Sequence, residues 1–426
     1  MKRIVSLLLV MALCLAGGSF ALAEEDSTIE LWYQMNNVGD PALPEEEWWI
    51  TQAIEAYEAA HPNIHIELNI PSGQVEVTQT WKAAVVAGTE PDVVDLWTGT
   101  NLFPLEELLL DPTEYITQED FEHITTWNEC YLDFDSDKKL LAIPVVEPGV
   151  NVCTFYYNKQ AFEKAGVDAA AIKTLDDFVA ALQKLQDAGY QPITCDDEGY
   201  GVGFCCLGIW WANHVGSAGI YADSIGDGTS FAEDEAFRSV LTMANEWYKK
   251  GWINQDYATC TESLSNFISG SAAIFGAGTW YMGDLVAAMG EDNLGVMPMP
   301  AWREDDAFSF ASMGGNGQGF CISRNCEHPQ EVCDFLSFLN SKEQAELAQL
   351  QHPVLPGRDD VSFALGDGAF TKQIMEASAN STFYYDNTMR ADVVVEFYRL
   401  FPMVVTGAMS VDEAIATLDA TAAAGA

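Results

Sequence analysis

Basic residues are scarce in this sequence. Lysine and arginine together number 19, against 64 aspartates and glutamates in 426 residues, which gives a formal net charge of −45. Nucleic acid is excluded as a partner, because this charge repels a phosphate backbone. Anionic ligands and anionic membrane surfaces are disfavoured for the same reason. Most of the acidic side chains are expected to form a solvated surface that keeps the protein dispersed.

Motifs of catalysis and metal binding are also missing. The six histidines form no H-E-x-x-H pair, and the sequence contains neither a G-x-S-x-G elbow nor a Walker loop. A chain with this many acidic residues contains carboxylate pairs at every spacing, so no pair can be assigned to glycoside hydrolysis. We therefore expect no catalytic residues, no bound metal and no cofactor.

The sequence has one long apolar run, and it lies at the N-terminus. Lys2 and Arg3 precede the apolar residues 4–15, and residues 21–23 (Ala-Leu-Ala) supply the small-x-small site that signal peptidase cleaves. We therefore expect residues 1–23 to be a signal peptide and the protein to be exported.

The exported chain is expected to begin at Glu24 and to retain nine cysteines, an odd number that leaves at least one thiol unpaired or paired between chains. Export permits disulfides without requiring them. Cys14 lies inside the apolar run, but Leu13 precedes it where a lipoprotein signal has a small residue. The sequence thus predicts an extracellular or cell-surface protein and leaves lipid anchoring open.

Hydrophobic periodicity alternates between the patterns of strands and helices. Strands are expected at residues 29–33, 64–70 and 93–96, and helices at residues 50–60, 81–86, 174–189, 237–251 and 332–339. Alternating strands and helices are typical of an α/β sheet. In such sheets a ligand binds beyond the carboxyl ends of the strands.

Seven segments of the sequence, in this order, resemble the family 1 extracellular solute-binding proteins of ABC importers. They are AIEAYEAAHPNIHIELNI, AAVVAGTEPDVVDLW, LLAIPVVEPGVNVCTFYYNKQAFEKAGVDAAAIKTLDDFVAALQKLQDAGYQPI, FISGSAAIFGAGTWYMGDL, GVMPMP, GGNGQGFCISRNCEHPQEVCDFLSFLNSKEQAE and SVDEAIATL. The resemblance runs from about Ile29 to the C-terminus.

The resemblance implies a two-lobe α/β fold of the periplasmic-binding-protein type, similar to maltose-binding protein, with hinge strands and a ligand cleft between the lobes. The expected division is residues 24–143 in lobe 1, 144–298 in lobe 2, 299–341 back in lobe 1 and 342–426 back in lobe 2. Residues 144–146 and 297–299 are the expected hinge crossings.

The resemblance also implies a function. The protein would capture a sugar or oligosaccharide outside the cell, as a monomer, and deliver it to the transmembrane subunits of an ABC permease, and it would not be an enzyme. Two alternatives stay open: a binding protein for a polyamine or peptide, which the acidic charge would suit, and a secreted glycan-processing enzyme.

A sugar site needs aromatic platforms for the ring faces, and carboxylates and amides for the hydroxyl groups. Trp280 matches the aromatic residue that follows the glycines in the family's motif, and Gly314, Gly315 and Asn316 match its glycine turn. The other ligand-binding candidates, chosen by position at strand ends and loops, are Gln34, Asn36, Asn37, Asp95, Trp97, Glu147, Trp210, Trp211 and Asn213.

For the tryptophan pair and for Asp95, the sequence is compatible with either a ligand contact or a structural role. Trp210 and Trp211 are adjacent and are expected on a strand, where neighbouring side chains point to opposite faces. We therefore expect one of them in the cleft and the other packed in the core. Asp95 could contact a ligand or could cap the turn that follows its strand.

Overall fold

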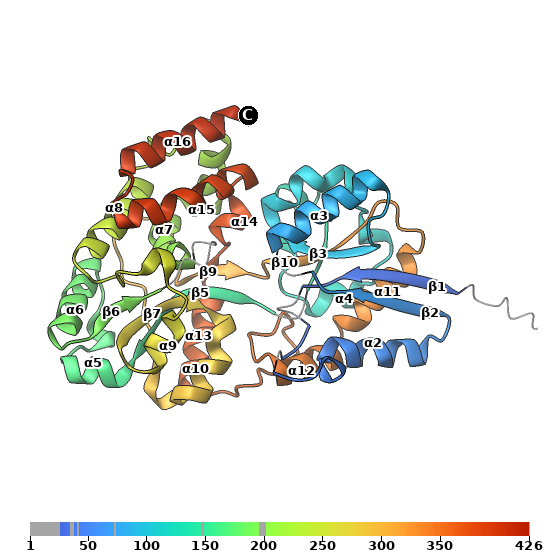
Figure 1. Ribbon diagram of the computed structural model, residues 1–426, viewed down its shortest axis with the longest axis horizontal. Helices are drawn as coiled ribbons and strands as arrows, with labels where there is room; N and C mark the ends of the chain where they lie inside the picture. The colour runs from blue at the N-terminus through green and yellow to red at the C-terminus, as the bar shows by residue number, and fades with distance from the viewer. Residues whose placement is uncertain are drawn as a thin grey trace, which may run out of the picture.

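The computed structural model describes residues 26–34, 38–40, 42–71, 74–145, 149–195 and 202–425, and the chain folds into two lobes that lie side by side (Figure 1). Each lobe contains one β-sheet with helices packed against it. We call the five-stranded sheet and its helices lobe 1, and the six-stranded sheet and its helices lobe 2. The expected two-lobe α/β fold is confirmed.

The sheet of lobe 1 has the strand order β2-β1-β3-β10-β4. Its strands are β1 (Ser27–Trp32), β2 (Ile64–Asn69), β3 (Val93–Trp97), β4 (Ile143–Pro144) and β10 (Gln318–Ile322). Strand β1 is parallel to β2 and β3, whereas β10 is antiparallel to β3 and β4. The helices of lobe 1 are α2 (Trp49–Ala60), α3 (Gln74–Ala87), α4 (Gln118–His123), α11 (Pro329–Leu339) and α12 (Lys342–Gln351).

Helix α2 and strand β2 of lobe 1 form where the periodicity predicts them. Helix α2 buries Ile50, Ile54 and Tyr57, which recur at helical spacing on one face. Strand β2 buries Ile64 and Ile66 and exposes the residues between them, which is the pattern of a strand with one face on a core.

The sheet of lobe 2 has the order β11-β9-β5-β7-β6, and β8 pairs with β5. Its strands are β5 (Asn151–Asn158), β6 (Gln191–Thr194), β7 (Ala272–Gly278), β8 (Leu294–Val296), β9 (Ser312–Gly315) and β11 (Ser381–Thr382). Its helices are α5 (Lys159–Ala165), α6 (Leu175–Asp187), α7 (Val202–Ile225), α8 (Glu235–Lys249), α9 (Ser263–Ile268), α10 (Met282–Met289), α13 (Ala369–Ala379), α14 (Tyr385–Thr388), α15 (Ala391–Thr406) and α16 (Val411–Ala424).

Helices cover both faces of the lobe 2 sheet. On β9, Met313 joins the core formed with α7, α8 and α15, whereas the hydroxyl of its neighbour Ser312 donates to the Ala377 carbonyl of α13, 2.7 Å away. The core on the second face includes side chains of α9, α10 and α13. One face of this sheet therefore packs on α7, α8 and α15, and the other on α9, α10 and α13.

Two expected lobe boundaries are wrong. Residues Met297 and Met299, expected at a hinge, pack in the core of lobe 2, and the chain returns to lobe 1 only between β9 and β10. Helix α12 was expected in lobe 2, but Ala345 and Ala348 on it pack in the core of lobe 1. The first passage between the lobes runs from the end of β4 to the start of β5, and residues 146–148 lie outside the described part of the chain.

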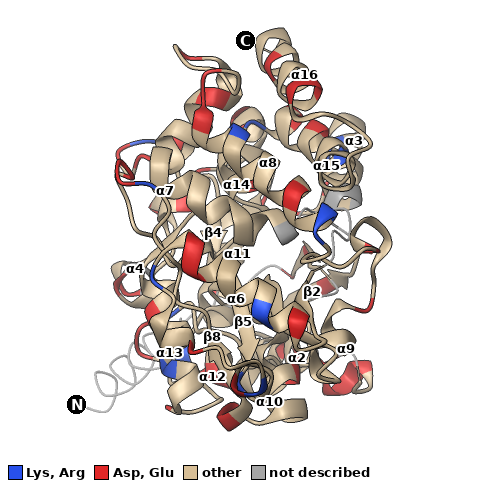
Figure 2. Ribbon diagram, turned by 90° about the vertical axis from the view of Figure 1, so that its left-hand side faces the viewer, with Lys and Arg blue, Asp and Glu red and all other residues tan. Residues whose placement is uncertain are grey.

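Acidic positions are scattered over helices and loops, and basic positions are few (Figure 2). Six of the acidic residues, at the N-termini of three helices, complement the positive end of the helix dipole: Asp176 and Asp177 on α6, Glu235 and Asp234 on α8, and Asp412 and Glu413 on α16. These six carboxylates are therefore placed where a helix end stabilises their charge.

Candidate functional site

The passage between β9 and β10 joins the two lobes, and predicted site residues lie on both sides of it. On the lobe 1 side, Trp97 ends β3 and is paired in register with Gln318 of β10. The next backbone N–H, that of Thr98, donates to the Gly317 carbonyl at 3.0 Å. The end of β3 is therefore fixed against the passage itself.

On the lobe 2 side, Trp280 lies at the end of β7, in the short helix η10 (Thr279–Tyr281). Its side chain is 40% exposed, and its ring covers Gly278, where a Cβ atom would lie 2.1 Å from the indole. The Thr279 hydroxyl donates to Oδ1 of Asn151 at 3.1 Å and accepts from the Val152 N–H at 3.0 Å. These bonds hold Trp280 beside the start of β5.

The two sides are connected through β9. Gly315 is paired in register with Asn151, and Gly314 with Val152. The chain of contacts therefore runs from Trp97 through the passage to Trp280. These links connect five of the predicted site residues along one path: Trp97, Gly314, Gly315, Asn316 and Trp280.

A buried carboxylate, Glu129, is hydrogen-bonded at this passage, and no motif around it pointed to a site. It lies in the short helix η6 (Asn128–Cys130) and is 2% exposed. Its Oε1 accepts from the Asn316 N–H at 3.2 Å, and its Oε2 accepts from the Thr98 hydroxyl and the Asn387 amide, each at 3.3 Å. A Cβ atom on Gly315 would lie 1.8 Å from Oε1, so a larger residue there would displace the Glu129 carboxylate.

Burial dominates the acidity of this carboxyl. It raises the pKa of Glu129 to about 7, although the hydrogen bonds from Asn387, Asn316, Thr98 and Gly317 favour the ionised form and lower it. No lysine, arginine or histidine of the described residues forms an ion pair with Glu129. The group is therefore a buried carboxyl held by neutral donors alone.

Helix α14 of lobe 2 contacts the loop that follows β3 in lobe 1. The Thr100 hydroxyl donates to the Met389 carbonyl at 2.5 Å, and the Asn101 amide donates to the Asp386 carbonyl at 3.3 Å. Gly99 has a φ of +64°, and a Cβ atom there would lie 2.0 Å from the Asn387 carbonyl oxygen. The two lobes are therefore in direct contact beside the passage.

A cavity of about 320 Å³ opens at the same junction. It is lined from lobe 1 by Thr125, Thr126, Asn128 and Glu129, and from lobe 2 and the passage by Val150, Gly314, Gly315, Ser378, Ala379, Ser381 and Phe383. Ser378 and Ala379 belong to α13, so the cavity lies on the α13 face of the lobe 2 sheet. Gly276 of β7 faces Cys206 of α7, and Gly278, two residues further along the strand, points to the same face. The ring of Trp280 covers Gly278, so Trp280 lies on the α7 face of the sheet, opposite the cavity.

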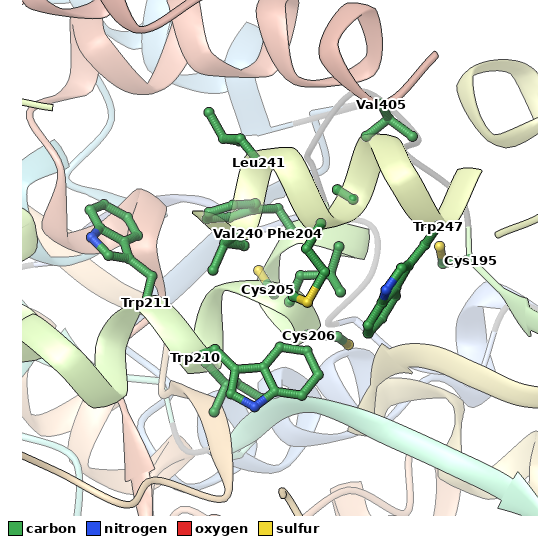
Figure 3. Close-up of a cluster of buried hydrophobic side chains, with 14 of the residues drawn as sticks. Cys195, Phe204, Cys205, Cys206, Trp210, Trp211, Val240, Leu241, Trp247 and Val405 are labelled. Carbon is green, nitrogen blue, oxygen red and sulfur yellow. The ribbon is translucent and has the colours of Figure 1, made fainter. Parts of the chain in front are cut away.

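The prediction for Trp210 and Trp211 is corrected by the structure. Both lie on helix α7 rather than on a strand, and both are fully buried (Figure 3). Trp210 packs near Phe178 and Trp247, whereas Trp211 packs near Phe237. Neither indole has a surface that a ligand could touch, because both lie in the fully buried segment 204–213 of this helix.

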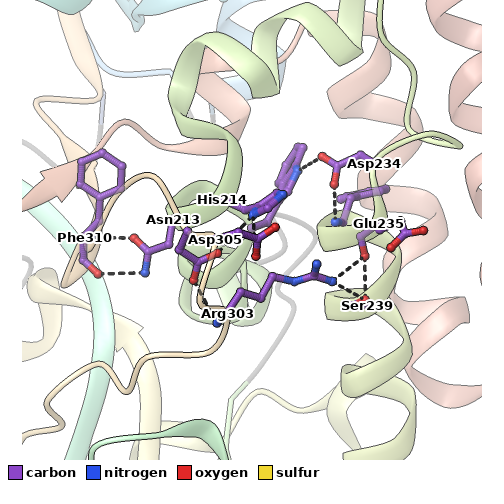
Figure 4. A network of polar contacts seen from close by, with 11 residues as sticks. Asn213, His214, Asp234, Glu235, Ser239, Arg303, Asp305 and Phe310 are labelled. Atoms are coloured by element: carbon purple, nitrogen blue, oxygen red, sulfur yellow. Dashed lines mark hydrogen bonds and ion pairs between the residues drawn. The ribbon is translucent and has the colours of Figure 1, made fainter.

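Three polar candidates are also buried inside the lobes. Gln34 donates from its amide to the Asp95 carbonyl at 3.1 Å, which ties β1 to β3, and Asp95 itself is fully buried. Asn213 accepts the Phe310 N–H at 2.6 Å through its side-chain oxygen, so it anchors the loop that precedes β9 (Figure 4). Asn36, Asn37 and Glu147 lie outside the described residues.

Two groups of a histidine and two aspartates have side-chain atoms close enough to share a cation. They are His123 with Asp359 and Asp360, and His214 with Asp305 and Asp306. In the first group Asp360 already pairs with Arg358, and in the second the His214 ring lies 3.2 Å from Asp306. Neither group shares a residue with the junction described above.

In the described part of the chain, no helix is both long enough and apolar enough to cross a membrane.

Comparison with known proteins places the chain in a family. Residues 42–346 match the model of the bacterial extracellular solute-binding proteins. An uncharacterised ABC transporter extracellular-binding protein of Pyrococcus horikoshii is 24% identical over 359 residues, which are 79% of this chain and 76% of that protein. An arabinooligosaccharide-binding protein of Halalkalibacterium halodurans is 27% identical over 203 residues, 46% of this chain and 43% of that one.

Among solved structures, a chitin oligosaccharide binding protein superposes with a TM-score of 0.79 at 20% identity, covering 94% of this chain and 99% of its own. At that identity the likeness establishes the fold alone. The family match covers more than half of the chain. This protein belongs to the bacterial extracellular solute-binding protein family.

Proposed function

We propose that this protein captures a neutral sugar or oligosaccharide outside the cell and delivers it to an ABC importer. The observation that carries the proposal is Trp280: a large indole, 40% exposed, held at the end of β7 beside the start of β5. An exposed indole face matches the C–H face of a sugar ring. The names of the arabinooligosaccharide-binding relatives support the same ligand class.

In this proposal Trp280 of lobe 2 and Trp97 of lobe 1 hold the ligand when the lobes close. The passages between β4 and β5 and between β9 and β10 act as the hinges. Closure is a population shift, driven by contacts that the ligand makes only in the closed state. The closed protein then docks on the permease as a monomer, and it carries out no chemistry on the sugar.

The test is a thermal-shift screen of residues Glu24–Ala426. The probes are arabinose and xylose, the trisaccharides arabinotriose, mannotriose and chitotriose, and, as the competing class, spermidine and short peptides. A ligand at about 100 times its dissociation constant should stabilise the protein by roughly 2.7 kcal/mol. A raised melting temperature with one class of sugar supports the proposal. Shifts with amines or peptides alone contradict it, and they would favour the ligand class that suits the acidic charge.

A glycan-processing enzyme is separated from a binding protein by incubating the protein with the sugar that gives the shift. Unchanged sugar after prolonged incubation supports binding without turnover. Release of shorter products contradicts the proposal.

A further inference from the structure

We propose that Glu129 couples closure of the two lobes, and with it ligand affinity, to the uptake of one proton. This inference rests on the proposed function, since it concerns the affinity of the same site. It makes Glu129 a positioning residue that acts on the ligand through the lobes and does not touch it.

The geometry places one carboxyl where three parts of the chain meet. Glu129 and Thr98 belong to lobe 1, Asn316 to the passage between the lobes, and Asn387 to lobe 2. The Asn387 amide also donates to Thr98 Oγ1 at 3.1 Å and to the Gly317 carbonyl at 3.2 Å. If the lobes separate, Asn387 moves away from the carboxyl with lobe 2, and water can take its place.

Closure therefore removes water from a carboxyl that has no basic partner. Burial disfavours the charged form, and the neutral donors offset only part of that cost, so the closed protein binds a proton more tightly than the open one. The protonated carboxyl keeps a partner, because the Thr98 hydroxyl can accept a hydrogen bond as well as donate one. The cavity beside Glu129, lined by Thr125 and Asn128, gives the proton a route to solvent.

Three of the other titratable groups around Glu129 are thiol or phenol groups, and the rest are carboxyls. Burial raises the pKa values of Cys130 on η6, Cys321 on β10 and Tyr384 before α14 well above their usual ranges, so these three stay neutral. Two carboxyls complete the set. Asp95 lies buried in β3, and burial raises the pKa of Asp386 on α14 to about 6. Asp386 is bonded to Tyr398 within lobe 2, 2.7 Å away, and does not bridge the lobes.

Closure of the lobes should be favoured at low pH. A carboxyl whose pKa is higher in the closed than in the open protein favours closure at low pH. This advantage is lost as the pH rises through about 7, the pKa of Glu129 in this structure, where the two lobes are in contact. For an open-state pKa near the ordinary value of glutamate, affinity should fall roughly ten- to thirtyfold between about pH 5.5 and about pH 8.

The first experiment needs no ligand. Small-angle scattering of the ligand-free protein at about pH 5.5 and about pH 8 measures how closed the lobes are. We expect the wild type to have the smaller radius of gyration at the lower pH, and the Glu129→Gln variant to have the same radius at both. An unchanged radius in the wild type, or an equal change in Glu129→Gln, overturns the proposal without bearing on which ligand the protein binds.

Asp223→Asn is the matched control. Burial raises the pKa of Asp223 to about 7 as well, but this carboxyl lies on α7, inside lobe 2. Asp386→Asn tests the other nearby carboxyl. Both variants should keep the pH-dependent radius of the wild type, and loss of that dependence in either one contradicts the assignment to Glu129.

A second variant keeps the test valid if Glu129→Gln does not fold. Asn387→Ala leaves the carboxyl in place and removes a donor that lowers its pKa. The midpoint of the pH-dependent change in radius should therefore move to higher pH, and an unmoved midpoint contradicts the proposal. Once the screen has identified a sugar, its affinity should show the ten- to thirtyfold fall in the wild type and less than about a twofold fall in Glu129→Gln.

Discussion

Trp280 and Trp210 are the same residue type in opposite environments. Trp280 is 40% exposed at the end of β7, whereas Trp210 is completely buried in the core of lobe 2. Changing Trp280 to alanine should weaken binding of the sugar identified by the screen by roughly ten- to a hundredfold, because the stacking surface is lost. Titration calorimetry measures this effect. The melting temperature should hardly change.

Trp210→Ala is the comparison for that experiment. Removing this indole leaves a cavity among Phe155, Phe178 and Trp247, and should lower the free energy of unfolding by about 3–5 kcal/mol. Urea denaturation measures the loss. If Trp280→Ala loses stability instead and keeps its affinity, the assignment of Trp280 to the ligand site is wrong.

The burial of Asp223 predicts that the stability of the folded protein depends on pH. Burial raises its pKa to about 7, and the neighbouring carboxyls of Asp234 and Asp419 add to the rise. The folded protein therefore binds a proton more tightly than the unfolded chain, so this group lowers stability as the pH rises from about 4 to about 7. Asp223→Asn should be more stable than the wild type at about pH 8, and the advantage should disappear at about pH 4. An advantage of equal size at both pH values would show that packing, rather than ionisation, is responsible.

Two helices begin with the same reciprocal cap. Thr174 and Asp177 cap α6, and Ser410 and Glu413 cap α16, each side chain bonding the other's backbone N–H. Thr174→Ala and Ser410→Ala should each lower the free energy of unfolding by about 1 kcal/mol. Both caps belong to lobe 2 but lie on separate helices, so the double variant should lose about the sum. A clearly smaller loss in the double variant would mean that the two helix ends are coupled.

Helices with one apolar face could be predicted from the sequence, and α7 could not. Helix α6 has the predicted cap at Thr174 and a buried stripe that includes Phe178 and Leu182. Residues 204–212 of α7 are all buried, so the segment lacks the polar positions that reveal helical spacing. Its two tryptophans were therefore assigned to a strand, and their burial could not be anticipated.

The candidate site was predictable only where it has a local motif. Trp280 and the glycines at 314 and 315 were selected by their sequence context, and the structure places them on either side of β5. Glu129 and Asn387 are 258 residues apart, and neither lies in a recognisable motif. Their contact depends on how the lobes meet, which no local pattern encodes.

The charge of the whole molecule predicts an effect of salt. At a formal charge of −45 the folded chain repels itself, and added ions screen that repulsion within a Debye length of about 10 Å at 0.1 M. Raising sodium chloride from about 10 mM to about 300 mM should raise the melting temperature by at least about 2 °C. Potassium chloride should act equally. A rise with one salt alone would indicate binding of a specific ion instead of screening.

The order of strands in lobe 1 also has a consequence for when the protein can fold. Among the described strands, β4 pairs only with β10, which lies between it and β3 in the sheet. The ribosome makes β4 about 175 residues before β10, and nearly all of the lobe 2 sheet is synthesised in that interval. The sheet of lobe 1 therefore cannot be completed, and one edge of it stays unpaired, until most of lobe 2 has been synthesised.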